Sequence, residues 1–220
     1  MPTKKTITYQ EIPDFNNIYS VRQKKLHCFL IVLNDGSLCV FSPLKNLPKD
    51  TYESIESIGP ISLIVAPNHY HNAALIECSE NFPNVKFCAS KEAAVRLRKI
   101  TGLDFMPLAY LEEKLPQHIS IVSPPGLKTG EFWLRIKQDN QVGWIVVDAF
   151  SGASTSDEGS RVEMLKTFPS YGVKDSSLYK NWLINQIDGD SPATIMPCHG
   201  NIVRSNSLGI QMKYLLSTKL

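Results

Sequence analysis

Residues 61–72 read Ile-Ser-Leu-Ile-Val-Ala-Pro-Asn-His-Tyr-His-Asn, an apolar run that stops at a proline and is followed at once by two histidines. Ile61 to Ala66 is short and almost wholly apolar, as expected for a strand that is buried on both faces. Ligand sites in layered α/β folds usually lie just beyond the carboxyl ends of such strands. This stretch therefore predicts a buried strand with a functional site at its end.

The segments around this strand alternate between strand and helix patterns. The first part of the chain looks irregular, and then an Asn-Asp-Gly turn at 34–36 joins apolar runs into a hairpin. The expected elements are strands over 27–33, 37–41 and 84–89, and helices over 47–58, 71–82 and 91–100, the last with Ser90 as its cap. Such alternation is the signature of an α/β layered fold.

The second half of the sequence repeats this order of elements. Asp139-Asn140 is expected to join two alternating stretches into a second hairpin, and a polar segment over 151–161 is expected to be an exposed loop. The remaining expected elements are strands over 119–122, 131–137, 141–147 and 193–196, and helices over 177–187 and 208–216. Two such halves predict two mixed sheets packed face to face, with helices outside.

The composition is that of an ordinary globular chain. Of the 220 residues, 43% are hydrophobic and 20% are charged, which excludes intrinsic disorder. No linker or internal repeat divides the chain, so we expect a single domain over 1–220. The formal net charge of +2 is too small to point to nucleic acid or an anionic membrane, and favours a small-molecule substrate or ligand. Nothing in the sequence indicates an oligomeric state.

Cysteine usage and the absence of a long apolar run indicate a cytoplasmic protein. No stretch approaches the ~20 apolar residues of a membrane span, and no apolar region follows Lys4 and Lys5 as it would in a secretory signal. The five cysteines are scattered and lack CxxC spacing, so reduced thiols are expected. Cys28, Cys39 and Cys88 sit in apolar strands and are expected to be core residues.

Polar groups that can bind a metal follow three of the expected strands. His69 and His71 follow the first strand, Asp148 ends the run 144–147, and His199 follows the run 194–196. If these strands are neighbours with the same polarity, the four side chains share one rim of the fold. Imidazole and carboxylate are ligands for zinc, iron or manganese, and zinc needs only three protein ligands and a water. The other two histidines, His27 and His118, are expected to be structural or solvated.

These motifs resemble those of the metallo-β-lactamase superfamily. Asn68-His69-Tyr70-His71 is similar to the start of its HxHxDH loop, and residues 124–130 (PPGLKTG) to its PGHTxG turn. Val147-Asp148-Ala149 is similar to the strand end that carries its bridging aspartate, and residues 197–200 (PCHG) to its late PGHG loop. The segments DGSL at 35–38 and VAPN at 65–68 are similar to a poorly characterised branch. The resemblance implies an αββα sandwich with a site at the shared edge of both sheets.

The sequence departs from the superfamily pattern at three positions. Ala73 and Ala74 stand where the motif has Asp and His, and Leu127 stands where the PGHTxG turn has its histidine. A two-metal site is therefore not expected. One alternative is a mononuclear hydrolase of a small ester, thioester or phosphoester. Its single zinc, iron or manganese ion would be held by His69, His71 and some combination of Asp148 and His199.

In that alternative Asp148 belongs to the catalytic centre, and Tyr70 and Asn68 position substrate or stabilise an oxyanion. The other alternative is a metal-free, non-catalytic descendant in which Asp148 orients an imidazole and the pocket binds a ligand or a protein. The segment Ser151 to Tyr171, with Phe168 and Pro169 near its end, is a candidate lid or docking loop, or else a surface insertion.

Overall fold

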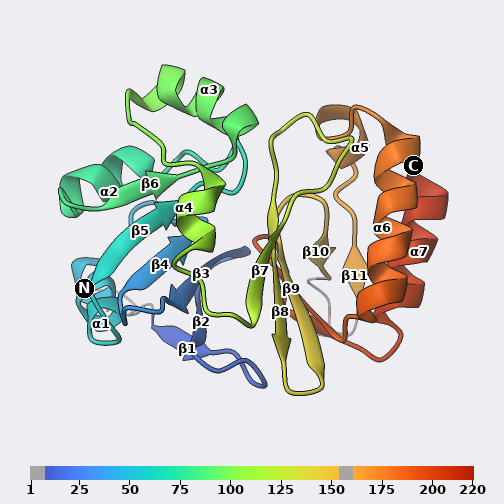
Figure 1. Ribbon diagram of the computed structural model, residues 1–220, viewed down its shortest axis with the longest axis horizontal. Helices are drawn as coiled ribbons and strands as arrows, with labels where there is room; N and C mark the ends of the chain where they lie inside the picture. The colour runs from blue at the N-terminus through green and yellow to red at the C-terminus, as the bar shows by residue number, and fades with distance from the viewer. Residues whose placement is uncertain (1–7, 154–160) are drawn as a thin grey trace, which may run out of the picture.

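The computed structural model describes residues 8–153 and 161–220 and arranges them in four layers, helix, sheet, sheet and helix (Figure 1). The first sheet holds six described strands in chain order: β1 (Tyr9–Glu11), β2 (Ile18–Gln23), β3 (Leu26–Val32), β4 (Leu38–Phe41), β5 (Ile61–Val65) and β6 (Lys86–Cys88). Pairing is antiparallel from β1 to β4 and parallel from β4 to β6. This is the mixed sheet that a hairpin followed by β/α units produces.

The second sheet holds five described strands in the order β13-β12-β9-β8-β7. Their bounds are β7 (Ile119–Val122), β8 (Trp133–Gln138), β9 (Gln141–Val146), β12 (Thr194–Pro197) and β13 (Val203–Arg204). Strands β9 and β12 are parallel neighbours, and the other pairs are antiparallel. A separate two-stranded ribbon pairs β10 (Ser151–Gly152) with β11 (Val162–Glu163).

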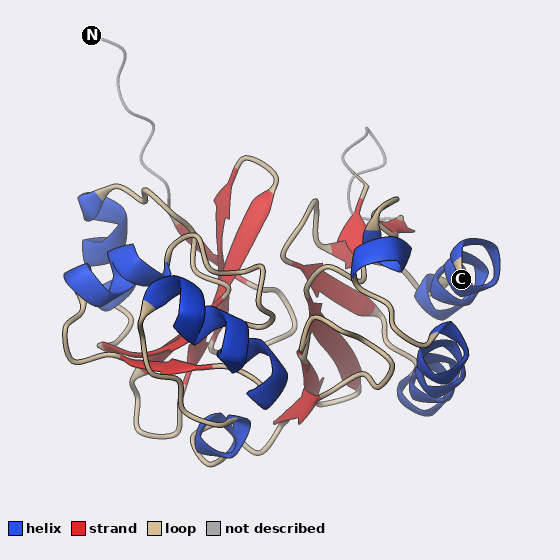
Figure 2. Cartoon of the chain, turned by 90° about the horizontal axis from the view of Figure 1, so that it is seen from above, coloured by secondary structure: helices blue, strands red, loops and turns tan. Residues whose placement is uncertain are grey.

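Helices cover the outer face of each sheet, as the view from above shows (Figure 2). Those beside the first sheet are α1 (Lys49–Glu56), α2 (Leu75–Asn81) and α3 (Lys91–Thr101), and those outside the second are α6 (Ser176–Asp190) and α7 (Leu208–Lys219). The short helices α4 (Leu108–Glu112) and α5 (Phe168–Tyr171) lie in connections. None of the helices in the described part combines the length and apolar character that crossing a bilayer requires.

Alternating side chains of the first sheet serve two cores. In β3, Phe29 and Ile31 belong to the cluster between the sheets, whereas Cys28 and Leu30 belong to the cluster under α1–α3. This follows from the period of two in a strand, and it explains why the strand shows no polar face. Cys28, Cys39 and Cys88 are buried free thiols, as predicted.

The α/β class and the two face-to-face sheets are confirmed, and several element boundaries are corrected. The segment 9–23 is not irregular as expected, because β1 and β2 pair there. Asp14 and Asn17, both with positive φ, lie in the turn between these strands. The helix expected from residue 71 begins only at Leu75. Ser90 does cap α3, accepting from Ala93 N at 3.2 Å.

The segment expected as an exposed loop over 151–161 contains a buried strand instead. Ser151 and Gly152 pair with Glu163 and Val162, and the backbone of Gly152 donates to His199 O at 3.1 Å. Residues 154–160 lie outside the described part of the chain, as do residues 1–7, on which the expectation about a secretory signal partly rests.

Candidate metal centre

The two sheets meet at the edge where the motif-bearing loops emerge. Strands β9 and β12 run side by side with Val146 opposite Pro197, so that Asp148 and His199 leave the second sheet at the same end. Strand β5, expected as their neighbour, lies in the other sheet, and the loop after it reaches the same place from across the sandwich. Phe132 N donates to Pro67 O at 3.0 Å and ties this loop to the second sheet.

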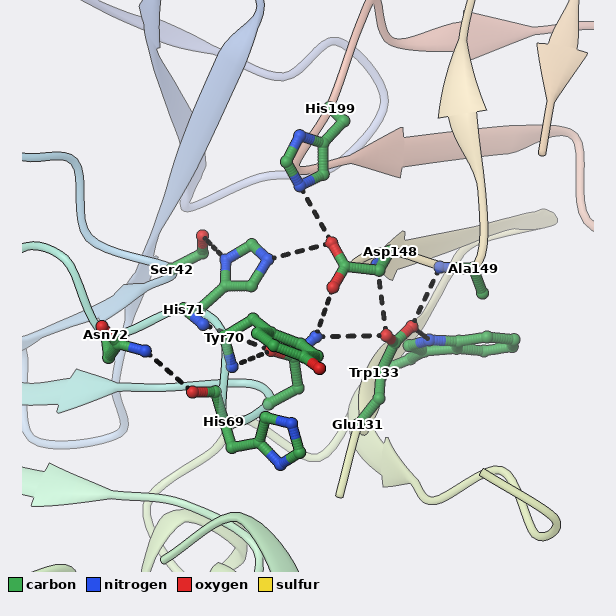
Figure 3. A network of polar contacts seen from close by, with 11 residues as sticks. Ser42, His69, Tyr70, His71, Asn72, Glu131, Trp133, Asp148, Ala149 and His199 are labelled. Atoms are coloured by element: carbon green, nitrogen blue, oxygen red, sulfur yellow. Dashed lines mark hydrogen bonds and ion pairs between the residues drawn. The ribbon is translucent and has the colours of Figure 1, made fainter. Parts of the chain in front are cut away.

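His71, Asp148 and His199 converge on one point. Asp148 Oδ1 lies 3.2 Å from His71 Nε2 and 2.9 Å from His199 Nε2 (Figure 3). One ligand atom from each of the three residues lies within 4.8 Å of the others. Two imidazole nitrogens and a carboxylate oxygen are a donor set that zinc, iron and manganese accept, and the spacing fits a single small cation.

His69 is not part of this group. Its imidazole points away from Asp148 (Figure 3), and its Nε2 lies 3.5 Å from Arg96 Nη1. Because a guanidinium can only donate, the His69 Nε2 accepts this contact. Partial burial and the Arg96 charge lower the pKa of His69. Of the four predicted ligands, the structure therefore brings three together and turns the fourth toward Arg96 on α3.

Asn68 holds the loop and Asp148 at the same time. Its Nδ2 donates to Asp148 Oδ2 at 2.8 Å and to Glu131 Oε2 at 3.3 Å. Its Oδ1 accepts from Tyr70 N at 2.8 Å and His71 N at 3.2 Å, which folds residues 68–71 into a turn instead of a helix. Asn68 is wholly buried and its amide is fully used within this network, so it acts by positioning its neighbours.

Glu131 is a buried carboxylate behind the centre that the sequence patterns did not single out. It accepts hydrogen bonds from Trp133 Nε1 at 2.7 Å, from Asp148 N at 3.2 Å and from Ala149 N at 3.3 Å (Figure 3). Burial and the Asp148 charge raise the pKa of Glu131 above its usual range. Glu131 thus fixes the backbone that carries Asp148. The sequence feature that could have identified Glu131 is an acidic residue directly before a strand of buried aromatic and aliphatic residues.

The electrostatics of the centre favour an ionised Asp148. Burial by itself would raise the pKa of this carboxyl group, but the hydrogen bonds from His199 and His71 outweigh it and lower the pKa. His71 is oriented from its other side, since Ser42 Oγ lies 2.7 Å from His71 Nδ1. A hydrogen bond at Nδ1 directs Nε2 toward Asp148 and is the usual way in which a metal-binding imidazole is aligned.

A pocket of about 520 Å³ opens above His71, Asp148 and His199. Tyr70 lies in its wall with its ring edge-on to that of Tyr171, at a centroid distance of 5.4 Å. Leu165 and Tyr171 also line it, so the end of the segment 151–171 contributes to the pocket. The volume is typical of a small-molecule site.

Known structures share this architecture, although no family model and no curated protein matches the sequence. The DIM-1 metallo-β-lactamase is 12% identical with a TM-score of 0.65, and the match covers 97% of this chain and 98% of that one. A flavodiiron protein from Giardia intestinalis is 13% identical (TM-score 0.64; 97% and 59% covered), and a variant of the one from Thermotoga maritima is 14% identical (TM-score 0.66; 96% and 60% covered).

The match to these structures runs along the whole chain, which spans nearly the full length of DIM-1 and about three fifths of the two flavodiiron proteins. The chain therefore has the metallo-β-lactamase fold, as its motifs predicted.

Proposed function

We propose that the chain is a metal-dependent hydrolase of a small ester, thioester or phosphoester, with one zinc, iron or manganese ion held by His71, Asp148 and His199. The observation that carries the proposal is the approach of two imidazole Nε2 atoms to one oxygen of a buried carboxylate at the base of a pocket. Such a three-residue set leaves room for a water, as catalytic zinc sites do.

A single ion agrees with the groups that surround the centre. Asn68 Nδ2 donates to the carboxylates of both Asp148 and Glu131, so an amide and not a cation joins these two acids. Neither Ala73 nor Leu127 supplies a ligand atom at the positions where the superfamily pattern has one. Within residues 8–153 and 161–220, no second group of ligands for a two-metal mechanism is present.

Each residue of the site has a definable task. A bound ion supplies Lewis-acid chemistry and lowers the pKa of a water. Asp148 is held by Asn68, and His71 is held by Ser42, so that the donor atoms keep their mutual geometry. Tyr70, half-exposed in the pocket wall, is placed to orient the substrate or to donate to an oxyanion.

The second candidate is a non-catalytic protein that binds a ligand or a partner in the same pocket. It is favoured by the hydrogen bonds that Asp148 Oδ1 already accepts from the Nε2–H groups of His71 and His199, because these bonds hold the three side chains together without an ion. The two candidates differ in whether turnover depends on these side chains and on added metal.

Turnover tests the proposal directly. The protein, loaded in turn with zinc, iron(II) and manganese(II), is offered 4-nitrophenyl acetate, a short acyl thioester and bis(4-nitrophenyl) phosphate. We expect metal-dependent hydrolysis of at least one of them, lost in H71A and H199A and retained in H118A, which alters a histidine remote from the centre. Turnover that persists in H71A, or no turnover of any of the three, would contradict the hydrolase proposal.

A further inference from the structure

The side chains that line the pocket indicate what kind of molecule fits it. Aliphatic and aromatic side chains form a large part of its lining, with Leu26, Leu44, Leu165 and Tyr171 among the contributors. Leu26 and Tyr70 are large apolar side chains that stay substantially exposed at this pocket. Exposed apolar surface beside a functional site indicates a ligand with an apolar body.

Among the described residues that line the pocket, Lys45 is the only lysine or arginine. Asp148 is the only acidic residue among them, and its Oδ1 is taken by His71 and His199. Within the described part of the chain, no acidic group lies within ion-pairing distance of Lys45. The charge of Lys45 is therefore free to meet a negative charge on a ligand.

The segment that carries Lys45 is held in a defined shape. It continues directly from Ser42, which bonds His71, and both Ser42 (φ 60°) and Asn46 (φ 57°) adopt the left-handed region. Asn46 N donates to both oxygens of Glu77, at 2.8 and 3.1 Å, and Tyr52 OH donates to the same carboxylate at 3.2 Å. Backbone conformations of this kind persist only where the surroundings enforce them, and they are common beside binding sites.

The fixed segment also explains why Lys45 lacks a partner on its own loop. Glu77, which lies beside the next residue of this segment, accepts hydrogen bonds from the Asn46 backbone and the Tyr52 hydroxyl. Glu77 therefore anchors the loop, and Lys45 remains without an acidic partner in the lining of the pocket. A charge held at the edge of an apolar cavity selects for ligands that carry the opposite charge.

We infer that the pocket takes a small organic anion, with its apolar body against Leu44, Leu165 and Tyr171 and its anionic group on Lys45. The inference names the substrate class of the proposed hydrolase, an ester or thioester with a free negative group, and in that sense rests on the proposed function. The binding step itself needs only the pocket and Lys45.

Binding of hexanoate to the full-length protein tests the inference, with hexan-1-ol as the neutral probe and acetate as the probe without an apolar body. Affinities are measured by calorimetry on protein freed of metal by a chelator, so that the anion cannot bind through an ion. The variant is K45Q, and the matched control is K49Q, which removes an exposed lysine on α1 that pairs with Glu53.

We expect hexanoate to bind more tightly than hexan-1-ol or acetate, and K45Q to weaken hexanoate by about fivefold while K49Q leaves it unchanged. Equal binding of hexan-1-ol, no saturable binding of hexanoate, or unchanged binding in K45Q would overturn the inference. Failure of the hydrolase proposal looks different: turnover is absent, but the Lys45-dependent binding of hexanoate persists.

Discussion

His27 is expected to make the stability of the protein fall between pH 6.5 and pH 4. Its side chain is buried near the start of β3, and its ring stacks on Phe29 at a centroid distance of 5.9 Å. Burial, assisted by the charge of Arg22, lowers the pKa of His27 from 6.5 to about 4. The unfolded chain binds a proton on this residue below pH 6.5, whereas the folded protein does so only near pH 4.

The size of this effect follows from the two pKa values. At about 1.4 kcal/mol for each unit of pKa, the difference corresponds to about 3 kcal/mol. Stability is fully present above pH 6.5, is lost progressively as the pH falls, and is not lost further through this residue below about pH 4. Other groups titrate as well, so the contribution of His27 is the difference between the wild type and a variant that cannot titrate.

Urea unfolding of the wild type and of H27Q at half-unit steps from pH 4 to pH 8 measures that difference. We expect the free energy of unfolding of the wild type to approach or cross that of H27Q as the pH falls, with a relative change of about 3 kcal/mol. If the two free energies of unfolding differ by a constant amount over this range, His27 is not desolvated in the folded state and does not cause the loss of stability.

Three further substitutions probe the supports of the centre and of the fold. E131A removes the acceptor of four buried N–H groups, including those of Trp133 and Asn68, and should lower the free energy of unfolding by about 3 kcal/mol; a loss no larger than that of the control E163A, at a half-exposed carboxylate, measured in urea, would contradict the role of Glu131. S42A removes the hydrogen-bond partner of His71 Nδ1 and should weaken zinc binding by about tenfold with little change in stability; unchanged zinc affinity in a competition assay with a chromophoric chelator would contradict the role of Ser42. S90A removes the cap of α3 and should cost about 1 kcal/mol in thermal unfolding, whereas an unchanged melting temperature would mean that the cap contributes nothing.

The order of strands and helices was largely predictable because it depends on local pattern. Apolar runs that serve two cores, such as 61–65, leave an unmistakable signal, and so do turn residues such as Asn34-Asp35-Gly36. Among the strands that escaped, β1, β13 and the β10–β11 ribbon are two or three residues long, whereas β2 has six residues. The short ones owe their existence to pairing with other segments of the chain. Periodicity in a window of sequence carries no trace of such pairing.

The sequence predicted where the candidate site lies, but not which residues form it. The strand ends pointed to His69, His71, Asp148 and His199, because ligand sites gather beyond the carboxyl ends of strands. Asp148 and His199 do follow neighbouring strands, whereas the loop with His69 and His71 reaches the site from the other sheet. The separation of His69 from His71 depends on the turn that Asn68 builds with its side chain, and Glu131 acts from the segment just before β8. Both effects arise from buried hydrogen bonds between segments, and these become visible only once the chain is folded.

Zinc titration by calorimetry tests whether one metal ion is held by His71, Asp148 and His199. The wild type and H69A are expected to bind one zinc per chain with similar affinity, because the His69 imidazole points away from the group. H71A and H199A are expected to lose about a hundredfold or more in affinity. A loss in H69A as large as that in H199A, or no stoichiometric binding by the wild type, would contradict the claim.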